Sequence, residues 1–492
     1  MRDTVRFLLG GERRELHGVD PTMTVLDYLR LVERRCGTKE GCAEGDCGAC
    51  TVVIGRPSET GGAVRYEAVN ACIQFVPMLD GVQLLSVEDL KGPDGALHPV
   101  QEALVESNGS QCGFCTPGFV MSLFARYYEP EPAESIDDTL AGNLCRCTGY
   151  RSIVAAAERM HETGGGYEDR FARNERETAR LLAGLSDEET LCIKRDGRRF
   201  LAPATLDALA DLLVAHPEAR IVAGATDVGL WVTKQLRVLD TMISVGRVAE
   251  LKQIVETPEA IEIGAGATYT EAAPVIARHY PDFGELIRRL GSVQIRNAGT
   301  IGGNVANGSP IGDTLPALIA AGATLHLRRG AERRSLPLEE FFLAYGRQDR
   351  RPGEFVERVT LPKPATGTGT RFRAYKVSKR FDQDISAVCG AFSLMLEQDR
   401  VAAVRIAYGG MAPTPKRAAE AEAALLGQPW TRATVEAAMA ALTRELTPIS
   451  DMRASAEYRM RVARNLLMRL FVETTDPAAE TRLVGERRLA HA

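Results

Sequence analysis

EGCAEGDCGAC spans residues 40–50 and places Cys42, Cys47 and Cys50 in the spacing C-x4-C-x2-C. Cys72 follows after 21 further residues. This spacing is typical of a [2Fe–2S] site, because each iron needs two thiolates and a short loop can turn its sulfurs inward around the cluster. The stretch therefore predicts an iron–sulfur loop at the start of the chain.

Glycines alternate with these cysteines at Gly41, Gly45 and Gly48. Glycine permits positive φ angles and a close approach of backbone to sulfide, so that N–H groups can donate to the sulfurs. The alternatives are a zinc site or inert buried thiols, but zinc sites usually pair two C-x2-C units. Cys36 lies outside the pattern, and we expect it to be a small buried residue.

A second set of cysteines consists of Cys112 and Cys115 in C-x2-C spacing, and Cys145 and Cys147 in C-x-C spacing, with 29 residues between the pairs. Taken alone, this set is compatible with zinc. A second cluster beside the first would make an electron relay. Helices expected after Cys115 and Cys147 would point their positive dipole ends toward an anionic cluster.

Composition limits the remaining classes. The chain has 492 residues, which suggests several domains, and its net charge of −5 argues against a basic nucleic-acid binder. Nine of its 11 cysteines lie within the first 147 residues, unlike the cysteines of a disulfide-stapled secreted protein. No signal-peptide core or 18-residue apolar run is present, so we expect a cytoplasmic protein without a membrane span. The seven histidines, from His17 to His491, form no metal-binding pattern.

Hydrophobic periodicity predicts the secondary structure. Strands are expected at residues 4–9, 51–54, 220–223, 243–245, 261–265, 324–327, 371–376, 391–396 and 403–408, and helices at 24–32, 98–107, 118–128, 152–161, 205–216, 270–279, 283–290, 431–442 and 455–471. In the last helix we expect Arg459 and its neighbouring arginines to form a solvated face.

Two glycine-rich loops are candidates for binding a nucleotide. Residues 223–229, AGATDVG, follow a predicted strand, and residues 300–313 are rich in Gly and Asn. Successive N–H groups in such loops can cradle a pyrophosphate, although plain structural turns would look the same. Gly264-Ala-Gly266 is not a Rossmann fingerprint, because Tyr269 stands where the third glycine would fall.

The cysteine segments are long enough to show a family resemblance. QCGFCTPG at 111–118 and GNLCRCTGYR at 142–151, together with residues 40–50, resemble the two-cluster region of the xanthine dehydrogenase / molybdenum hydroxylase family. The resemblance implies that Cys42, Cys47, Cys50 and Cys72 hold one [2Fe–2S] cluster and that Cys112, Cys115, Cys145 and Cys147 hold the other. It also implies that Gln111 approaches the molybdenum cofactor.

The resemblance implies a multidomain α+β fold. It comprises a β-grasp ferredoxin-like domain at 1–80, a four-helix [2Fe–2S] domain at 81–165, a linker at 166–190, a two-subdomain α/β FAD-binding domain at 191–365 and a C-terminal α+β flavoprotein domain at 370–475.

The resemblance also assigns positions that contact FAD. The pyrophosphate loop would be Val222, Ala223, Gly224, Ala225, Thr226, Asp227, Val228 and Gly229, and further contacts would come from Leu290, Thr300, Gly303, Asn304, Ser309, Asp313 and Lys376. Lys376 would lie near the isoalloxazine and favour an anionic reduced flavin; a surface lysine is the alternative. Leu290 replaces an aromatic residue that is frequent in the family.

No molybdenum domain follows residue 475, so the resemblance implies a partner subunit that carries the molybdenum cofactor, in an (αβ)2 heterotetramer like the bacterial two-subunit type. The expected activity is NAD+-dependent oxidation of hypoxanthine and xanthine, with electrons passing through both clusters to FAD. The alternatives are the same subunit of an aldehyde or N-heterocycle hydroxylase, and a zinc-bound nonredox interaction module. No nucleic acid or membrane partner is expected.

Overall fold

The computed structural model describes residues 1–58, 61–92, 95–132, 134–364, 369–476, 478–479 and 481. His491 and part of the predicted boundary between residues 365 and 370 lie outside them. The chain forms two compact units, the first made of Met1–Leu212, Glu218–Ala249 and Gly291–Gly299, and the second of Leu213–Pro217, Glu250–Leu290 and Thr300–Ala492. None of the described helices is long and apolar enough to cross a membrane.

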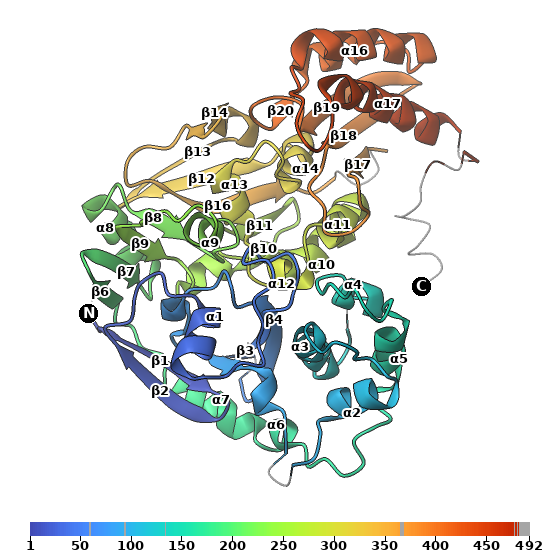
Figure 1. The fold of residues 1–492 in the computed structure, drawn as a ribbon. Coiled ribbons are helices and arrows are strands. Elements are labelled where there is room, and N and C mark those ends of the chain that lie inside the picture. The colour runs from blue at the N-terminus through green and yellow to red at the C-terminus, as the bar shows by residue number, and fades with distance from the viewer. Residues whose placement is uncertain are drawn as a thin grey trace. The chain divides into compact units, whose positions relative to one another are not determined.

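The first unit begins with a five-stranded sheet in the order β2-β1-β5-β3-β4 (Figure 1). Its strands are β1 (Thr4–Leu9), β2 (Glu12–His17), β3 (Thr51–Pro57), β4 (Val64–Asn70) and β5 (Gln83–Leu85). The pair β1–β5 is parallel and the other pairs are antiparallel. Helix α1 (Val25–Asp27) and the π-helical turn Tyr28–Val32 bury apolar side chains against this sheet. The arrangement matches the predicted β-grasp domain.

Four short helices then pack around a core of their own. They are α2 (Pro99–Glu106), α3 (Thr116–Tyr127), α4 (Ile136–Leu140) and α5 (Arg151–Arg159). Phe119, Leu123, Phe124 and Ile153 lie in this core, which also takes in Val53 of β3.

The predicted linker contains two helices, α6 (Arg170–Arg173) and α7 (Glu175–Ala183). Helix α7 buries Ala179 and Leu182 against Leu8 of β1 and Val64 of β4. This stretch therefore packs on the ferredoxin-like sheet through an apolar face, which could not be recognised in the sequence because charged residues surround it.

A second sheet of the first unit has the order β6-β7-β9-β8. Its strands are β6 (Leu191–Arg195), β7 (Arg198–Ala202), β8 (Arg220–Val222) and β9 (Thr241–Ser244). The helices α8 (Leu206–Ala215), whose last residues belong to the second unit, and α9 (Val228–Thr233) lie between these strands in sequence, and α12 (Val293–Arg296) contacts β4 of the ferredoxin-like sheet. Ile193, Phe200 and Met242 share one apolar core with Val5 and Phe7 of the ferredoxin-like sheet. The flavin-type segment and the first iron–sulfur segment are therefore one packed body within this unit.

The second unit contains the antiparallel sheet β10-β11-β16-β12-β13 and the sheet β17-β18-β19-β20. The strands are β10 (Ile254–Glu256), β11 (Ala260–Gly264), β12 (Thr324–Arg329), β13 (Glu332–Pro337), β16 (Phe355–Pro362), β17 (Arg371–Val377), β18 (Val388–Glu397), β19 (Arg400–Gly409) and β20 (Lys416–Arg417), with β14 (Phe342–Ala344) and β15 (Arg347–Gln348) as a separate pair.

The helices of the second unit cover these sheets. They are α10 (Tyr269–His279), α11 (Pro281–Arg288), α13 (Ile301–Asn307), α14 (Thr314–Ala321), α15 (Ala419–Leu425), α16 (Arg432–Glu445) and α17 (Ala456–Thr475). Helix α14 packs on β18 and β19, and α16 and α17, drawn in orange-red to red in Figure 1, bury their apolar faces in the core that they share with that sheet.

The expectation for Arg459 is wrong. Its side chain is 2% exposed, and its guanidinium donates to the carbonyls of Ala387 and Gly410 and to Asp451. A guanidinium can lie in a core when carbonyl and carboxylate oxygens surround it.

Candidate functional site

The first cysteine set converges at one end of the ferredoxin-like domain. Hydrogen bonds from the thiols of Cys47 and Cys72 lower the pKa of Cys42, and a hydrogen bond from Cys72 lowers the pKa of Cys50. The Cys47 N–H donates to Cys42 Sγ at 3.4 Å, and Asn70 Nδ2 lies 3.8 Å from Cys50 Sγ. Because each iron of a [2Fe–2S] cluster binds two thiolates, four neighbouring thiols at one end of the domain fit such a cluster.

The loop around these thiols depends on glycine. A Cβ atom at Gly41 would lie 2.7 Å from Cys47 Sγ, so that a side chain would displace the sulfur. Gly45 and Gly48 have φ angles of +78° and +70°. These are the close approach and the left-handed backbone that the sequence predicts.

The expectation for Cys36 is wrong, because this residue is exposed. Its carbonyl accepts a hydrogen bond of 2.7 Å from Lys39 Nζ. Cys36 lies in the polar turn after the π-helical segment, where its backbone rather than its thiol makes the contact. Cys192 and Cys389 are buried, as expected for ordinary apolar-like thiols.

The second cysteine set lies at the ends of helices. Cys115 is the N-cap of α3, and Cys145 and Cys147 lie in the turn before α5. Thiol hydrogen bonds pair Cys112 with Cys147 and Cys115 with Cys145. The backbone N–H of Phe114, followed by the thiol of Cys147, lowers the pKa of Cys112. The structure thus brings the four predicted ligands of this set together as two pairs.

Within the described residues, no group of three or more His, Cys, Asp or Glu side chains is arranged to hold a single metal ion. A [2Fe–2S] cluster needs a different arrangement, because it distributes four thiolates over two irons. Neighbouring pairs such as Cys112–Cys147 and Cys115–Cys145 fit that requirement.

A backbone hydrogen bond connects the two cysteine sets. The Leu144 N–H, next to Cys145, donates to the Cys47 carbonyl at 3.0 Å. The ligand loops of both sets therefore lie in contact within the first unit.

The predicted pyrophosphate loop, Val222–Gly229, connects β8 to α9, which begins at Val228. A Cβ at Gly224 would lie 1.6 Å from the Ala298 carbonyl oxygen, and Ala225 has a φ of +58°. This tight turn before a helix is compatible with a phosphate cradle.

The same loop packs on the turn that carries Cys72. Gln74 Nε2 donates to the Gly224 carbonyl at 2.9 Å, and a Cβ at Gly229 would lie 2.7 Å from the Ile73 carbonyl. Sequence reasoning missed Gln74, whose one signal is its place two residues after a predicted ligand.

The other predicted flavin positions lie in the second unit. Leu290 follows α11, Thr300 caps α13 by accepting from the Gly303 N–H at 2.9 Å, and Ser309 lies in the turn after α13. Asn304 Oδ1 accepts from Thr314 Oγ1 at 2.6 Å, directly beside Asp313.

Asp313 and Lys376 form a buried ion pair, with side chains 7% and 2% exposed. Ser386 Oγ donates to the other carboxylate oxygen of Asp313 at 2.5 Å, and the Lys376 carbonyl accepts from Arg289 at 3.3 Å. Lys376 is therefore not a surface lysine, and Asp313 offsets its charge. Ser386 and Arg289 were missed, because single residues outside a motif carry no sequence signal.

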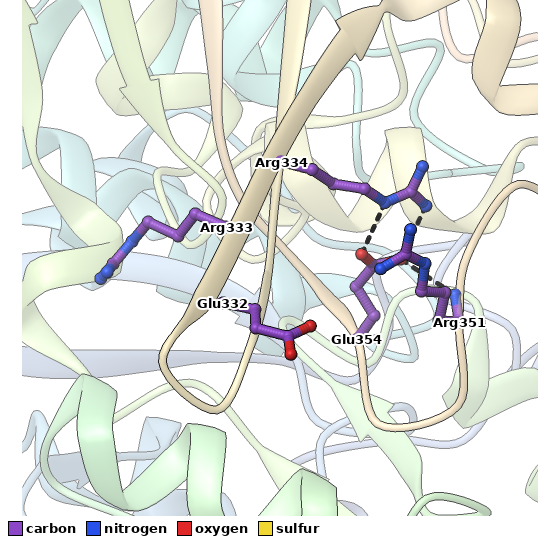
Figure 2. Close-up of a pocket in the computed structure, with 5 residues that line it drawn as sticks. All are labelled: Glu332, Arg333, Arg334, Arg351 and Glu354. Carbon is purple, nitrogen blue, oxygen red and sulfur yellow. Dashed lines mark hydrogen bonds and ion pairs between the residues drawn. The ribbon is translucent and has the colours of Figure 1, made fainter.

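A pocket of ≈ 240 Å³ in the second unit contains none of the predicted site residues (Figure 2). Arg334, at its wall, donates to both carboxylate oxygens of Glu354 at 2.7 and 2.8 Å. Arg333, also in the wall, donates to Glu357 at 2.9 Å. Because carboxylates neutralise these two guanidinium groups, the pocket is a poor anion site.

Four family models match the chain in order. They are the 2Fe-2S iron-sulfur cluster binding domain at residues 7–76, the [2Fe-2S] binding domain at 86–158, the FAD binding domain in molybdopterin dehydrogenase at 195–364 and the CO dehydrogenase flavoprotein C-terminal domain at 373–474. The predicted multidomain α+β class is confirmed, and both iron–sulfur domains and the FAD-binding domain are present. The boundaries between domains and the individual ligand residues stay predictions.

The chain is similar in sequence to xanthine dehydrogenases and in structure to other oxidoreductases. A xanthine dehydrogenase of Emericella nidulans is 32% identical over 95% of this chain and 38% of its own length, and a xanthine dehydrogenase/oxidase of Rattus norvegicus is 30% identical over 91% of this chain and 37% of its own. The chain thus spans about two fifths of these curated relatives. Carbon monoxide dehydrogenase from Hydrogenophaga pseudoflava matches 55% of this chain and 94% of its own with a TM-score of 0.52 and 28% identity. Quinoline 2-oxidoreductase from Pseudomonas putida 86 matches 58% of this chain and 99% of its own with a TM-score of 0.52 and 25% identity.

Proposed function

Because this chain has the domain layout of the small subunit of molybdenum hydroxylases, we propose that it is the electron-transfer subunit of a xanthine dehydrogenase. A partner subunit would carry the molybdenum cofactor and oxidise hypoxanthine and xanthine to urate. Two [2Fe–2S] clusters and FAD, when bound, would carry single electrons from that cofactor and deliver them in pairs to NAD+. The complex would be an (αβ)2 heterotetramer, in a cytoplasm where thiols stay reduced.

One chain of contacts in the first unit carries this proposal. The second cysteine set touches the first through the Leu144 N–H and the Cys47 carbonyl. Gln74, two residues after Cys72 of the first set, donates to the Gly224 carbonyl in the predicted pyrophosphate loop. This order of contacts supports electron transfer from the second set through the first set toward a flavin.

The residues of this chain act by binding and orienting. The thiolates would hold the irons, and the N–H groups around Cys42 and Cys145 would stabilise negative charge on the sulfurs. The Gly224 turn would present N–H groups to the pyrophosphate, and the buried Asp313–Lys376 pair would set the charge beside the flavin.

The test is to purify the chain with its natural partner and assay xanthine with NAD+. We expect NADH and urate in equal amounts, bound flavin and about four irons per chain. A complex that oxidises an aldehyde or an N-heterocycle, but not xanthine, would retain the electron-transfer role and overturn the substrate. A flavin-free protein containing zinc in place of iron would overturn the whole proposal in favour of a nonredox interaction module.

The second candidate, a hydroxylase of N-heterocycles, is favoured by one observation. Quinoline 2-oxidoreductase, whose name gives a heterocyclic substrate, matches this fold over 99% of its solved chain. The same preparation assayed with quinoline instead of xanthine separates the two candidates.

A further inference from the structure

A buried cluster of four polar side chains lies where four segments of the first unit meet. Thr51 comes from β3, Ser122 from α3, Asn143 from the turn after α4 and Gln294 from α12. Their exposures are 1%, 2%, 2% and 1%. Polar groups buried to this degree must satisfy one another by hydrogen bonds, so their relative positions are tightly constrained.

Gln294 is the centre of this cluster. Its Nε2 lies 3.2 Å from Thr51 Oγ1, 3.1 Å from Ser122 Oγ and 3.1 Å from Asn143 Oδ1. Gln294 belongs to the segment matched by the FAD-binding model, yet Gly291–Gly299 folds as part of the first unit. One side chain therefore ties a flavin-type segment to both iron–sulfur domains.

The cluster is built directly against the ligand loops. Thr51 Oγ1 donates to the Gly48 carbonyl at 2.6 Å, and Asn143 Nδ2 donates to the same carbonyl at 3.1 Å. Gly48 is next to Cys47, whose carbonyl accepts from Leu144, the residue after Asn143. The contact between the two cysteine sets therefore lies one residue from Asn143 on one side, and on the other side one residue from Gly48, whose carbonyl accepts from Thr51 and Asn143.

The packing leaves no free space there. A Cβ at Gly48 would lie 2.1 Å from the Gly142 carbonyl, and a Cβ at Gly142 would lie 2.0 Å from Gln294 Oε1. Gln294 Oε1 is buried and has no hydrogen-bond partner among the described residues. A buried unpaired oxygen opposes folding, so its presence calls for a role that the amide fills.

We propose that Gln294 is a positioning residue that holds the two cysteine sets at a fixed spacing and so controls electron passage between them. This inference rests on the proposed function. With both clusters bound, each transfer would move one electron from the cluster of the second set to that of the first set, so that the cluster of the second set is oxidised and that of the first set is reduced by the same amount. Gln294 touches neither set, and acts through Thr51 and Asn143 on the Cys47–Leu144 hydrogen bond.

The test replaces the amide in the full chain with Gln294→Leu. We expect faster hydrogen exchange at the Leu144 amide, because its acceptor loop is no longer held. We also expect loss of the magnetic interaction between the electron-resonance signals of the two reduced clusters, with an unchanged iron content per chain. The first readout does not depend on any cofactor.

Gln83→Leu is the matched control. Gln83 is 3% exposed, donates from Nε2 to the Gly10 carbonyl at 2.6 Å, and also has an Oε1 without a partner among the described residues. We expect this variant to lose thermal stability while it leaves Leu144 exchange and the magnetic interaction unchanged. Equal effects of both variants would overturn the proposal, because they would reflect general destabilisation.

Ser122→Ala is the milder variant, needed if Gln294→Leu does not fold. It removes one acceptor of Gln294 and should shift both readouts in the same direction by less. Unchanged Leu144 exchange in either folded variant would overturn the positioning role. A wild-type chain that binds no iron would instead overturn the proposed function, while the exchange measurement would still decide the role of Gln294.

Discussion

At the scale of single residues, the ion pair between Asp313 and Lys376 is buried, so its two charges interact strongly. Both side chains are nearly inaccessible, so neither charge is screened by water. Removing one partner of a buried pair leaves the other uncompensated, whereas removing both can be nearly neutral. Each charge of the pair therefore offsets the cost of burying the other.

We predict that Lys376→Met lowers the free energy of unfolding of the flavin-free chain by ~3–5 kcal/mol. The double variant Lys376→Met with Asp313→Asn should lose less than Lys376→Met alone, because no buried carboxylate is then left unpaired. Urea denaturation measures both. Arg180→Met, which breaks an exposed pair with Glu177, is the control and should leave the urea midpoint nearly unchanged. Additive losses in the double variant would show that the two charges do not stabilise each other.

The cysteines give a second prediction at this scale. Cys112→Ser should abolish the electron-resonance signal of one cluster and spare the other, because Cys112 pairs with Cys147 and with no member of the first set. Cys36→Ser is the control, since Cys36 is also exposed but lies outside both sets. Loss of both signals in Cys112→Ser, or of either in Cys36→Ser, would contradict the ligand assignment.

Residue-level prediction from sequence succeeds where a motif constrains several side chains at once. The cysteine spacing predicted that each set converges, because a cluster requires all four thiolates. It could not predict that Arg459 is buried, since the oxygens that accept from it come from Ala387 and Gly410, far away in sequence. The burial and contacts of Gln294 could not be predicted for the same reason, because its partners belong to other domains.

At the scale of elements, α2 depends on an unusual cap. His98 Nδ1 accepts from the Val100 N–H at 3.2 Å, and His98 Nε2 lies 3.1 Å from the Tyr128 hydroxyl. The residue is 0% exposed, and burial lowers the pKa of His98 to about 4. A protonated imidazole could not accept from Val100, so the cap works only in the neutral form.

We predict that the four-helix domain loses stability as the pH falls from about 6.5 to about 4. In this window the unfolded imidazole binds a proton that the folded one excludes, so stability rises with pH and the full contribution is present above pH 6.5. The change is on the order of 3 kcal/mol for a shift of this size. Circular dichroism melts of the full chain at several pH values measure it.

His98→Asn is the matched variant for this experiment, because asparagine can still cap α2 but does not titrate. It should flatten the pH dependence between about 6.5 and about 4. If wild type and His98→Asn lose stability in parallel over this window, titration of His98 is not the cause.

Elements with clear local signals were predicted closely. The last two helices begin one residue after Thr431 and Ser455, which accept from the N–H groups of Thr434 and Tyr458. Such caps act within one turn of helix and so are visible in sequence. The packing of α7 was not predicted, because Ala179 and Leu182 become a core face only against Leu8 and Val64.

At the scale of the whole molecule, the sequence order of domains and their packing differ. Residues 291–299 lie inside the FAD-binding match but fold with the iron–sulfur domains. Most of residues 195–249 of the same match also belong to the first unit, whereas residues 250–290 do not. Periodicity and motifs describe contiguous segments, so they could not reveal that the nine residues 291–299 return to the first unit. Because residues 291–299 belong to the first unit, Gln294 lies beside the ligand loops.

The proposed division of labour between subunits gives the last prediction. If this chain carries the flavin and both clusters, and the partner carries the substrate site, then NADH should reduce the isolated chain and xanthine should not. A hydride from NADH brings two electrons, the flavin accepts two and each cluster one, so the full capacity is about two NADH per chain. Anaerobic absorption spectroscopy should show flavin bleaching with NADH, followed by partial loss of iron–sulfur absorbance.

In Cys112→Ser the flavin should still bleach, because the predicted pyrophosphate loop adjoins the first cysteine set rather than the second. Bleaching of the isolated chain by xanthine would place the substrate site on this chain, and a flavin that NADH leaves oxidised would exclude NAD+ as the acceptor.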